Sequence, residues 1–265
     1  MMVDGRKIAD GIYDRLAPFF AAHHAKLGIV VVGENPVIES FVQIKTRAAE
    51  RLSVEMLRTD LPASATGAEI IEAVQRNAAQ ADAVIAQLPL PKDIDTNAVL
   101  SSLPIERDVD ALNPTVAEGD RPVHAPVALA VAEILQESGI EIKGKRTVVV
   151  GAGRLVGAPS AWLLKTLGAE VSMFTLQQGS IEDLKEADIV VSGAGNPGFI
   201  KPEHLKAGVA LIDAGTSEQG KKVVGDADPA CAEIASVFTP VPGGVGPVAV
   251  AMIFRNLQEL IEGAR

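Results

Sequence analysis

The fold is decided by the stretch Lys145-Arg-Thr-Val-Val-Val-Gly-Ala-Gly-Arg-Leu-Val-Gly-Ala-Pro-Ser-Ala-Trp-Leu-Leu-Lys-Thr-Leu167. Its β-branched run over 147–150 predicts a short buried strand. A glycine turn follows, and beyond it Ala161, Leu164 and Leu167 recur at helical spacing, which predicts a helix with these residues on one face. A strand, a turn and a helix in this order begin a βαβ unit.

Three glycines in the turn, Gly151, Gly153 and Gly157, follow the pattern G-x-G-x-x-x-G. The first two allow the backbone to turn tightly and approach a pyrophosphate, whose charge is stabilised at the helix N-terminus. Gly157 allows the helix to pack closely on the strand. Because the glycines lie between a predicted strand and a predicted helix, they favour a nicotinamide dinucleotide site. The alternative is a plain strand-to-helix turn that binds no ligand.

Composition limits the class of protein. The 265 residues suffice for one large or two ordinary domains. The chain is 48% hydrophobic and only 3% aromatic, so its core is aliphatic, as suits parallel α/β sheets. A net charge of −10 without a basic run argues against a nucleic-acid partner. The single cysteine, Cys231, excludes an intramolecular disulfide. With neither a signal-peptide pattern nor an apolar run of roughly 18 residues, we expect a soluble cytoplasmic protein without membrane contact.

The first half of the chain alternates helices and strands. Periodicity predicts helices over 4–20, 38–52 and 68–80, and strands over 27–32 and 83–86. On the second of these helices Phe41 and Lys45 stand four apart and share a face. The later strand ends in Gln87-Leu-Pro-Leu-Pro91, whose prolines fix a rigid loop where open α/β sheets bind ligands. A further loop over 107–114 holds two carboxylates.

The second half predicts a doubly wound parallel sheet. Residues 119–124 are polar and turn-rich and are interpreted as a linker. A helix is predicted over 127–138, and strands over 171–174, 189–192 and 210–213 join the strand already described. Residues 238–247 contain too much glycine and proline for a helix or strand and predict a shaped loop. A final helix is predicted over 248–262.

Several short blocks occur in order along nearly the whole chain. They are Val32-Gly-Glu-Asn-Pro36, Phe41-Val-Gln-Ile-Lys45, Gln87-Leu-Pro-Leu-Pro91, Asp108-Val-Asp110, 151–159, Ile212-Asp-Ala-Gly215, Gly225-Asp-Ala-Asp228 and Thr239-Pro-Val-Pro-Gly-Gly-Val-Gly-Pro247. In this combination the chain resembles the methylenetetrahydrofolate dehydrogenase/cyclohydrolase family, the bifunctional enzymes of one-carbon metabolism. The third and the last blocks are rather specific to it.

The resemblance implies two α/β domains. A folate-binding catalytic domain takes residues 1–119 plus 247–265, completed by the C-terminal helix. A Rossmann-like NAD(P)-binding domain takes residues 120–246, and the family is usually a homodimer through it. The dehydrogenase step moves a hydride from the one-carbon bridge of 5,10-methylenetetrahydrofolate to the nicotinamide. The cyclohydrolase step adds water to the methenyl cation and opens it to 10-formyltetrahydrofolate, a substrate class linked to purine biosynthesis.

Three residues match catalytic positions of the family. Lys45 matches its lysine; an amine sheltered from water beside a cationic folate has a lowered pKa and passes protons during water attack. Gln87 matches the glutamine that hydrogen-bonds this lysine, and its alternative is a strand-end side chain that binds loop backbone. Asp110 matches the residue that accepts paired hydrogen bonds from the pterin. Asp108 is interpreted as a turn or capping residue.

Other positions are carried over as binding residues. For the substrate they are Phe41, Lys45, Gln87, Leu88, Pro89, Asp110, Pro242, Gly243, Gly244 and Val245. For the cofactor they are Gly151, Ala152, Gly153, Arg154, Val156, Gly157 and Thr216. Trp162 and Met252 are interpreted as core residues. The four histidines show no ligand spacing with Cys, Asp or Glu, so we predict no metal.

The chain departs from the family pattern at three places. Phe41 replaces the usual tyrosine, so the ring can stack on the folate but a hydroxyl hydrogen bond to the lysine is lost. Val123-His-Ala-Pro126 replaces Pro-Cys-Thr-Pro, and Gly151-Ala-Gly153 lacks a hydroxyl contact to the cofactor. The segment Phe174-Thr-Leu-Gln-Gln178 offers neither the acid of NAD enzymes nor the base of NADP enzymes. We favour NADP on family habit, with NAD as the alternative and Arg154 as a candidate partner of a 2′-phosphate.

These features leave three hypotheses. The leading one is a bifunctional dehydrogenase and cyclohydrolase. The second, motivated by Phe41, is an NAD-linked dehydrogenase with weak or no cyclohydrolase activity. The third, motivated by the departures as a group, is a non-catalytic folate-binding relative, against which the retention of Lys45, Gln87 and Asp110 argues.

Overall fold

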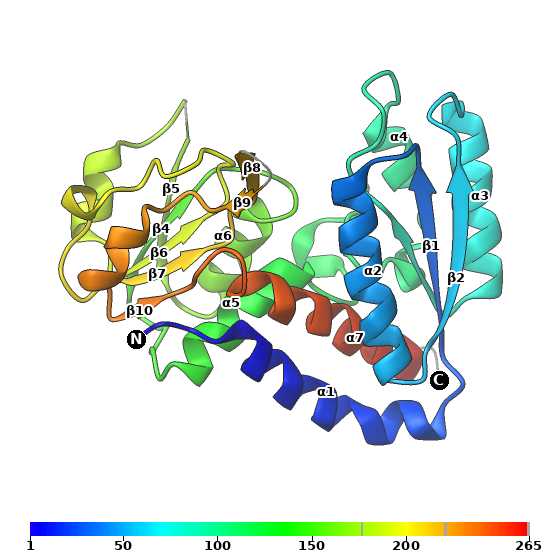
Figure 1. Cartoon of the computed structure of the whole chain (residues 1–265), viewed down its shortest axis with the longest axis horizontal. Helices are drawn as coiled ribbons and strands as arrows, with labels where there is room; N and C mark the ends of the chain where they lie inside the picture. The colour runs from blue at the N-terminus through cyan, green and yellow to red at the C-terminus, as the bar shows by residue number, and fades with distance from the viewer. Residues whose placement is uncertain (176, 220–221, 264–265) are drawn as a thin grey trace. The chain divides into compact units, whose positions relative to one another are not determined.

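The computed structural model describes residues 1–175, 177–219 and 222–263, so Leu176 lies outside the described residues. The chain divides into two compact units, each built from segments that are distant in the sequence (Figure 1). The five-stranded unit comprises Met1–Asp10 and Ala125–Met252, and the three-stranded unit comprises Gly11–His124 and Ile253–Arg265. Two helices, α1 (Gly5–Ala22) and α7 (Val245–Gly263), contribute residues to both units.

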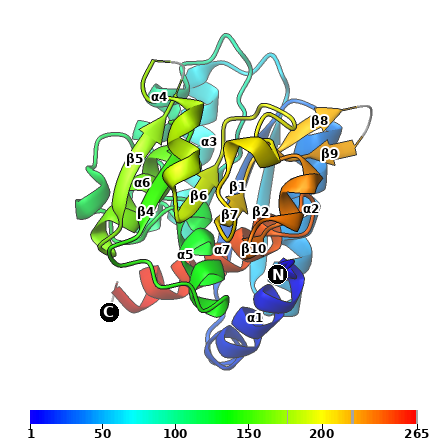
Figure 2. The same ribbon diagram turned by 90° about the vertical axis from the view of Figure 1, so that its left-hand side faces the viewer.

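The five-stranded unit is a parallel sheet with strand order β10-β7-β6-β4-β5 (Figure 2). Its strands are β4 (Arg146–Val150), β5 (Glu170–Phe174), β6 (Ile189–Ser192), β7 (Ala210–Asp213) and β10 (Val237–Phe238). From β4 the chain moves outward to β5 through α6 (Gly157–Thr166), then returns past β4 to β6 through the 3-10 helix η3 (Ile181–Glu186). Because such crossovers are right-handed, the two connections lie on opposite faces of the sheet. The sheet is therefore doubly wound, and its order reverses between β4 and β6.

Further short elements complete this unit. Helix α5 (Pro126–Glu137) packs on α6, and 3-10 helices η4 (Pro202–His204) and η5 (Pro229–Glu233) lie between later strands. At the sheet edge, Met2 pairs in parallel with Phe238 of β10, and the Gly5 amide donates to Gly243 O at 3.0 Å. The first residues of the chain thus continue this sheet at the edge formed by β10.

The three-stranded unit is a second parallel sheet, with order β2-β1-β3. Its elements are β1 (Lys26–Val32), α2 (Pro36–Arg51), β2 (Glu55–Leu61), α3 (Gly67–Gln80), β3 (Ala83–Ala86) and α4 (Thr96–Ser101), followed by the 3-10 helices η1 (Ile105–Arg107) and η2 (Glu118–Asp120). The chain passes outward from β1 to β2 and back to β3, so right-handed crossovers place α2 and α3 on opposite faces. Figure 1 shows the strands between these two helices.

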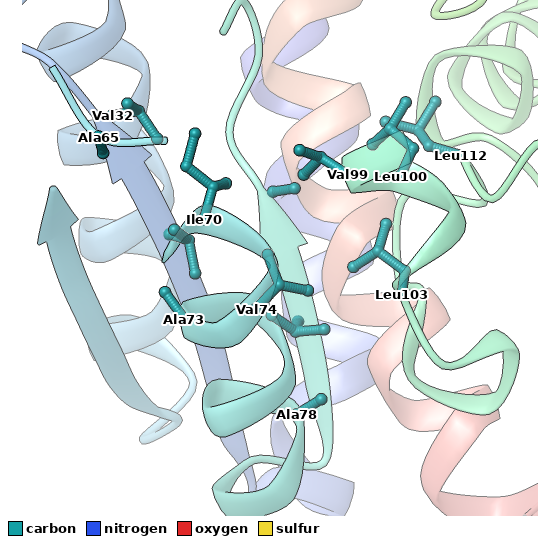
Figure 3. Close-up of a cluster of buried hydrophobic side chains, with 13 residues drawn as sticks. Val32, Ala65, Ile70, Ala73, Val74, Ala78, Val99, Leu100, Leu103 and Leu112 are labelled. Carbon is teal, nitrogen blue, oxygen red and sulfur yellow. The ribbon is translucent and has the colours of Figure 1, made fainter. Parts of the chain in front are cut away.

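An aliphatic cluster fixes the α3 face of this sheet (Figure 3). Val32 of β1 belongs to it with Ile70 and Val74 of α3, and Val99 and Leu100 of α4 complete the cluster. Ile70, Val74, Val99 and Leu100 are all fully buried. Each such side chain stabilises the fold by roughly 1.5–3 kcal/mol relative to an exposed one. The cluster therefore anchors the carboxyl end of β3, where Gln87 begins the next loop.

The C-terminal helix completes the three-stranded unit, as expected. Phe254 of α7 is fully buried and meets Tyr13 and Phe20 of α1 edge to face, at centroid distances of 6.4 and 6.5 Å. Such pairs are worth about 0.5–1.5 kcal/mol beyond their buried area. The predicted fold class, with a doubly wound sheet and a second α/β domain closed by the last helix, is confirmed.

Several short or charged elements escaped the sequence patterns. Strand β2 carries Glu55, Arg58 and Asp60 and lies at a sheet edge, where its alternate side chains meet solvent. The two strands of the antiparallel hairpin β8 (Ser217–Gln219) and β9 (Lys222–Val224) are each too short for a periodic signal. Helix α4 is equally short and begins at an Asp95 cap.

Two expectations are wrong in detail. The predicted loop over 238–247 is shorter, because Phe238 belongs to β10 and α7 already begins at Val245. Pro247 is tolerated there because the first helical turn needs no amide donor. In α6 the helix ends at Thr166, and Leu167 is its 43% exposed cap, so Leu163 and Leu164 form the buried face instead. Met252 is fully buried and Trp162 packs at the edge of a small core cluster, as interpreted.

Candidate functional site

The structure brings Lys45 and Gln87 into direct contact. Lys45 lies on α2, and Gln87 follows β3 at the carboxyl end of the three-stranded sheet. The Lys45 Nζ donates to Gln87 Oε1 at 2.6 Å. Helix α2 is started by Asn35, whose side chain accepts from the amides of Val37 and Ile38, so its register toward the sheet is fixed from the first turn.

Gln87 satisfies both interpretations of its role at once. Its side chain is buried, and its Nε2 donates to Leu88 O at 2.7 Å. Because the amide nitrogen is used by the loop backbone, the amide oxygen must face Lys45. The loop hydrogen bond therefore sets the orientation that allows Gln87 to hold the lysine.

Backbone pairing brings Asp110 to the same place. Asp108 forms a parallel bridge with Val84 of β3, so Asp110 advances along the strand toward Gln87. Asp108 itself is buried, and its Oδ2 accepts from the amides of Leu112 and Asn113 at 2.7 and 2.6 Å. This confirms its interpretation as a turn-capping residue. Asn256 of α7, which sequence analysis missed, donates to Val109 O at 2.8 Å and so anchors the segment that carries Asp108 and Asp110.

The electrostatics of the three residues are coupled. Burial lowers the pKa of Lys45, and the attraction of Asp110 opposes this shift. Burial likewise raises the pKa of Asp110, against the attraction of Lys45. Asp108, desolvated and close to Asp110, has its pKa raised to about 6. A lysine whose pKa is lowered by burial gives up its proton more readily than a solvated one.

The remaining substrate positions fall into two groups. Phe41 lies one turn before Lys45 on α2 and is 40% exposed, so its ring is open to contact. Leu88 packs against the aliphatic cluster, and Pro89 is exposed in the loop after it. Pro242, Gly243, Gly244 and Val245 belong instead to the five-stranded unit, at the start of α7. The structure thus gathers the residues of the first group in one unit.

The glycine turn after β4 has the geometry that a phosphate-binding turn requires. Gly151 has φ +92°, and a Cβ on Gly157 would lie 2.0 Å from Gly151 O. No side chain caps the N-terminus of α6, and Ala152, Gly153 and Arg154 are exposed in front of it. Val156 occupies the N-cap position, where its apolar side chain can accept no hydrogen bond. Such a helix end stabilises an anion.

Two buried carboxylates behind this turn were missed by sequence analysis. Asp213 ends β7 and Asp226 follows β9, and both accept several backbone hydrogen bonds. Thr216, predicted to contact the cofactor, lies exposed in the loop after β7. Both aspartates stand in quoted sequence blocks, and the available signals were the position of Asp213 at the end of a buried strand and that of Asp226 directly after Gly225.

Neither a metal-binding cluster nor a membrane-spanning helix is found among the residues that the structure describes. Among residues 1–175, 177–219 and 222–263, no group of His, Cys, Asp and Glu is arranged to hold a metal ion. In the same ranges no helix has the length and apolarity needed to span a membrane.

A doubly wound sheet with a glycine turn, together with a second α/β unit that holds a half-buried lysine, is typical of dinucleotide-dependent α/β enzymes. The catalytic-domain model of tetrahydrofolate dehydrogenase/cyclohydrolases matches residues 3–110, and the model of their NAD(P)-binding domain matches residues 125–265. The chain belongs to the tetrahydrofolate dehydrogenase/cyclohydrolase family.

Individual relatives agree. The bifunctional protein FolD of Methanoculleus marisnigri is 37% identical over 97% of this chain and 94% of its own. That of Acetivibrio thermocellus is 36% identical over 87% and 84%. Among solved structures, the Trypanosoma brucei methylenetetrahydrofolate dehydrogenase-cyclohydrolase (FolD), complexed with NADP and inhibitor, has a TM-score of 0.92 at 33% identity, covering 100% of this chain and 98% of that one.

The resemblance inferred from the sequence is therefore confirmed, and so is the leading hypothesis. The chain is a bifunctional enzyme of one-carbon metabolism. It oxidises 5,10-methylenetetrahydrofolate with a nicotinamide cofactor and hydrolyses the methenyl product to 10-formyltetrahydrofolate. Neither alternative hypothesis gains support from these comparisons.

Proposed function

We propose that Lys45, Gln87 and Asp110 form the catalytic centre of this enzyme and that Lys45 transfers the protons of methenyl hydrolysis. The observation that carries this proposal is the 2.6 Å hydrogen bond from Lys45 Nζ to Gln87 Oε1. It holds a half-buried amine whose pKa is lowered by burial. An amine of this kind acts as a proton acceptor and donor without a metal or a histidine.

The hydrolysis requires three proton movements, and Lys45 can perform the first two. Water adds to the electrophilic methenyl carbon, and neutral Lys45 takes the proton that the water releases. The bond from this carbon to the ring nitrogen then breaks, and the ammonium of Lys45 returns a proton to that nitrogen. The hydroxyl on the carbon loses its remaining proton to solvent water as it becomes the formyl carbonyl. Gln87 keeps Nζ in place throughout, because its oxygen accepts from either protonation state.

Asp110 binds the pterin. Among the residues that the structure describes, its carboxylate accepts no hydrogen bond, and burial raises its pKa. Paired N–H donors of a pterin ring would supply the missing hydrogen bonds side by side. Phe41 offers an exposed ring for stacking. Leu88 and Pro89, together with Pro242, Gly243, Gly244 and Val245, are assigned to the substrate on the family resemblance.

The cofactor is assigned to the turn after β4. The residues are Gly151, Ala152, Gly153, Arg154, Val156 and Gly157, with Thr216. The close packing of Gly157 on Gly151 and the uncapped start of α6 fit a pyrophosphate. When bound, the nicotinamide accepts the hydride. We favour NADP over NAD, supported by Arg154, whose side chain is exposed on the turn.

The lysine assignment is tested with Lys45→Met, which keeps the length of the side chain and removes the amine. Methenyl hydrolysis should fall to the rate without enzyme, while folate binding persists. Arg47→Met, an exposed cation two residues on in the same helix, is the control and should hydrolyse normally. Unchanged hydrolysis by Lys45→Met would remove the assignment.

Cofactor choice is tested by following absorbance at 340 nm with methylenetetrahydrofolate and either NADP or NAD. We expect a higher kcat/KM with NADP, and a loss of that preference in Arg154→Ala. Equal or better use of NAD by the wild type would favour an NAD-linked enzyme. Acid quenching separates methenyl from 10-formyl product and shows whether hydrolysis keeps pace.

Three broader expectations remain proposals. The domains are assigned as residues 1–119 plus 247–265 and residues 120–246. The enzyme is proposed to be a homodimer through the five-stranded unit, which sedimentation analysis tests directly. A cytoplasmic location is supported by the buried free thiol of Cys231.

A further inference from the structure

We infer that Asp226 is a positioning residue for the nicotinamide cofactor, because it holds the loop over 193–196 in the shape that receives the dinucleotide. This inference rests on the proposed function in one respect, namely that the turn over 151–157 binds the cofactor. Asp226 acts on that turn through the neighbouring loop over 193–196.

The loop over 193–196 lies where a ligand is expected. It follows β6, which neighbours β4, and the strand order reverses between these two strands. Ligands of open α/β sheets bind outside the carboxyl ends of the strands at such a reversal. The loops that follow β4 and β6 therefore form the two walls of the site.

These two loops are in direct contact. A Cβ on Gly193 would lie 2.3 Å from Val156 Cγ1, and one on Gly151 would lie 2.8 Å from Gly193 O. Only glycine fits at either position. Any movement of the loop over 193–196 therefore displaces the glycine turn against which it packs.

The carboxylate of Asp226 holds the loop through four donors. Its Oδ2 accepts from Ser192 Oγ and the Ala194 amide, both at 2.7 Å, and from the Gly195 amide at 3.3 Å. Its Oδ1 accepts from the Asn196 amide at 2.7 Å. The side chain is fully buried, so water does not compete for these donors. Charge-assisted hydrogen bonds of this kind are among the stronger ones in proteins.

Asp226 is itself held in place by Asp213. Asp213 Oδ1 accepts from the Asp226 amide at 3.1 Å and from the Gly215 amide at 2.9 Å, and its Oδ2 accepts from the Ala227 amide at 2.8 Å. A Cβ on Gly215 would lie 2.3 Å from Asp226 Cγ. Asp226 thus lies between the loops that follow β6 and β7, and Thr216 belongs to the second of these.

The test is Asp226→Asn in the full-length enzyme. The Asn side chain keeps one acceptor oxygen, but its NH₂ group points two donor hydrogens toward groups that are themselves donors. The hydrogen bonds accepted by that carboxylate oxygen in the wild type are therefore lost. We expect the dissociation constant of NADPH, measured by its fluorescence, to rise about tenfold or more, corresponding to the loss of one or two such bonds. Methenyl hydrolysis, which consumes no cofactor, should stay within twofold of the wild type.

A nearby carboxylate provides the matched control. Asp228 stands two residues on, half-exposed, and pairs with Lys201 Nζ at 2.7 Å. Asp228→Asn should leave both NADPH binding and hydrolysis unchanged. A purely structural role for Asp226 predicts that its variant loses both functions together with its circular dichroism signal.

A milder substitution tests the inference if Asp226→Asn does not fold. Ser192→Ala removes one of the four donors and should raise the NADPH dissociation constant severalfold. Unchanged NADPH binding in Asp226→Asn that still hydrolyses, or in Ser192→Ala if Asp226→Asn does not fold, overturns the inference. Failure of wild-type enzyme to bind NADPH would instead refute the cofactor assignment on which it rests.

Discussion

The two units build their proposed sites in opposite ways. In the three-stranded unit the site consists of side chains, an amine, an amide and a carboxylate, each brought by a different element. In the five-stranded unit it consists of backbone groups of glycine-containing loops, and buried carboxylates hold these loops in place. Chemistry on a folate needs groups that exchange protons, whereas holding a pyrophosphate needs amides and space. The chemistry proposed for each unit thus explains why one presents side-chain groups and the other presents backbone groups.

The buried aspartates make the contrast specific. Asp226 accepts four hydrogen bonds from its own unit, so its bonding capacity is used internally. Asp110 accepts none among the described residues and has only the attraction of Lys45 to offset its desolvation. A saturated carboxylate shapes its surroundings, while an unsaturated one is available to a ligand.

The largest effect is expected from Asp110→Asn. Removing the charge that is proposed to bind substrate and that attracts Lys45 should lower kcat/KM for methylenetetrahydrofolate by about 10²–10³-fold. Because that attraction raises the pKa of Lys45, any limb of the hydrolysis pH profile governed by Lys45 should move to lower pH. NADPH binding should be unchanged. A pH profile that does not move would mean that the two charges are not coupled.

Asp213→Asn tests the carboxylates that serve structure. Burial raises the folded-state pKa of Asp213 to about 6, from an ordinary value of 3.8. Its contribution to stability is therefore greatest below pH 3.8 and is lost as pH rises through 6. Between pH 4 and pH 7, the unfolding free energy of the non-titrating variant should rise by about 2 kcal/mol relative to that of the wild type. Urea unfolding at a series of pH values measures this difference, and a constant difference would contradict it.

Gly157→Ala tests the backbone-built site by adding one methyl group. That methyl would lie 2.0 Å from Gly151 O, so strand and helix must separate, at a cost of about 1–3 kcal/mol. NADPH binding and melting temperature should both fall, while hydrolysis persists below the melting point. Gly153→Ala is the control for stability, because nothing lies within 4 Å of its added Cβ. Equal melting temperatures of the two variants would show that the close packing is not required.

Asn256→Leu tests how the side-chain-built site is supported. It removes two buried hydrogen bonds, to Val109 O and His124 O, both 2.8 Å long. The loss of two such bonds costs roughly 1–3 kcal/mol and loosens the segment that carries Asp110. The KM for methylenetetrahydrofolate should rise severalfold with no change in NADPH binding. Gln258→Leu, on the same helix but only half-buried, should leave KM unaffected.

The smallest effect is expected from Phe41→Tyr. A hydroxyl in reach of Lys45 should raise hydrolysis by no more than about tenfold, the value of one good hydrogen bond. The dehydrogenase rate should change little, because the ring itself is retained. Measuring both rates in the same preparation isolates the hydroxyl. A larger change in the hydride step would assign the ring a different role.

The sequence predicted best where the cause of a structure is local. The strand over 147–150 and the glycine turn after it follow from adjacent residues, and Lys45 and Gln87 follow from short blocks of family sequence. Strand β2 was missed because its charged residues are accounted for only by its place at the edge of a sheet. Asn256 was missed because its partner Val109 lies 147 residues away. Asp226 likewise depends on a loop 30 to 34 residues earlier in the chain.

The interleaving of the two units has a consequence for how the chain is made. Residues 1–10 belong with residues 125–252, and residues 253–263 belong with residues 11–124. A chain growing from its N-terminus therefore has all three strands of the smaller sheet long before it has Phe254 and Asn256, which fill its core and pair its loop carbonyls. Contacts so distant in sequence slow folding. Synthesis of α7 is accordingly the event that allows the earlier-made sheet to reach its final stability.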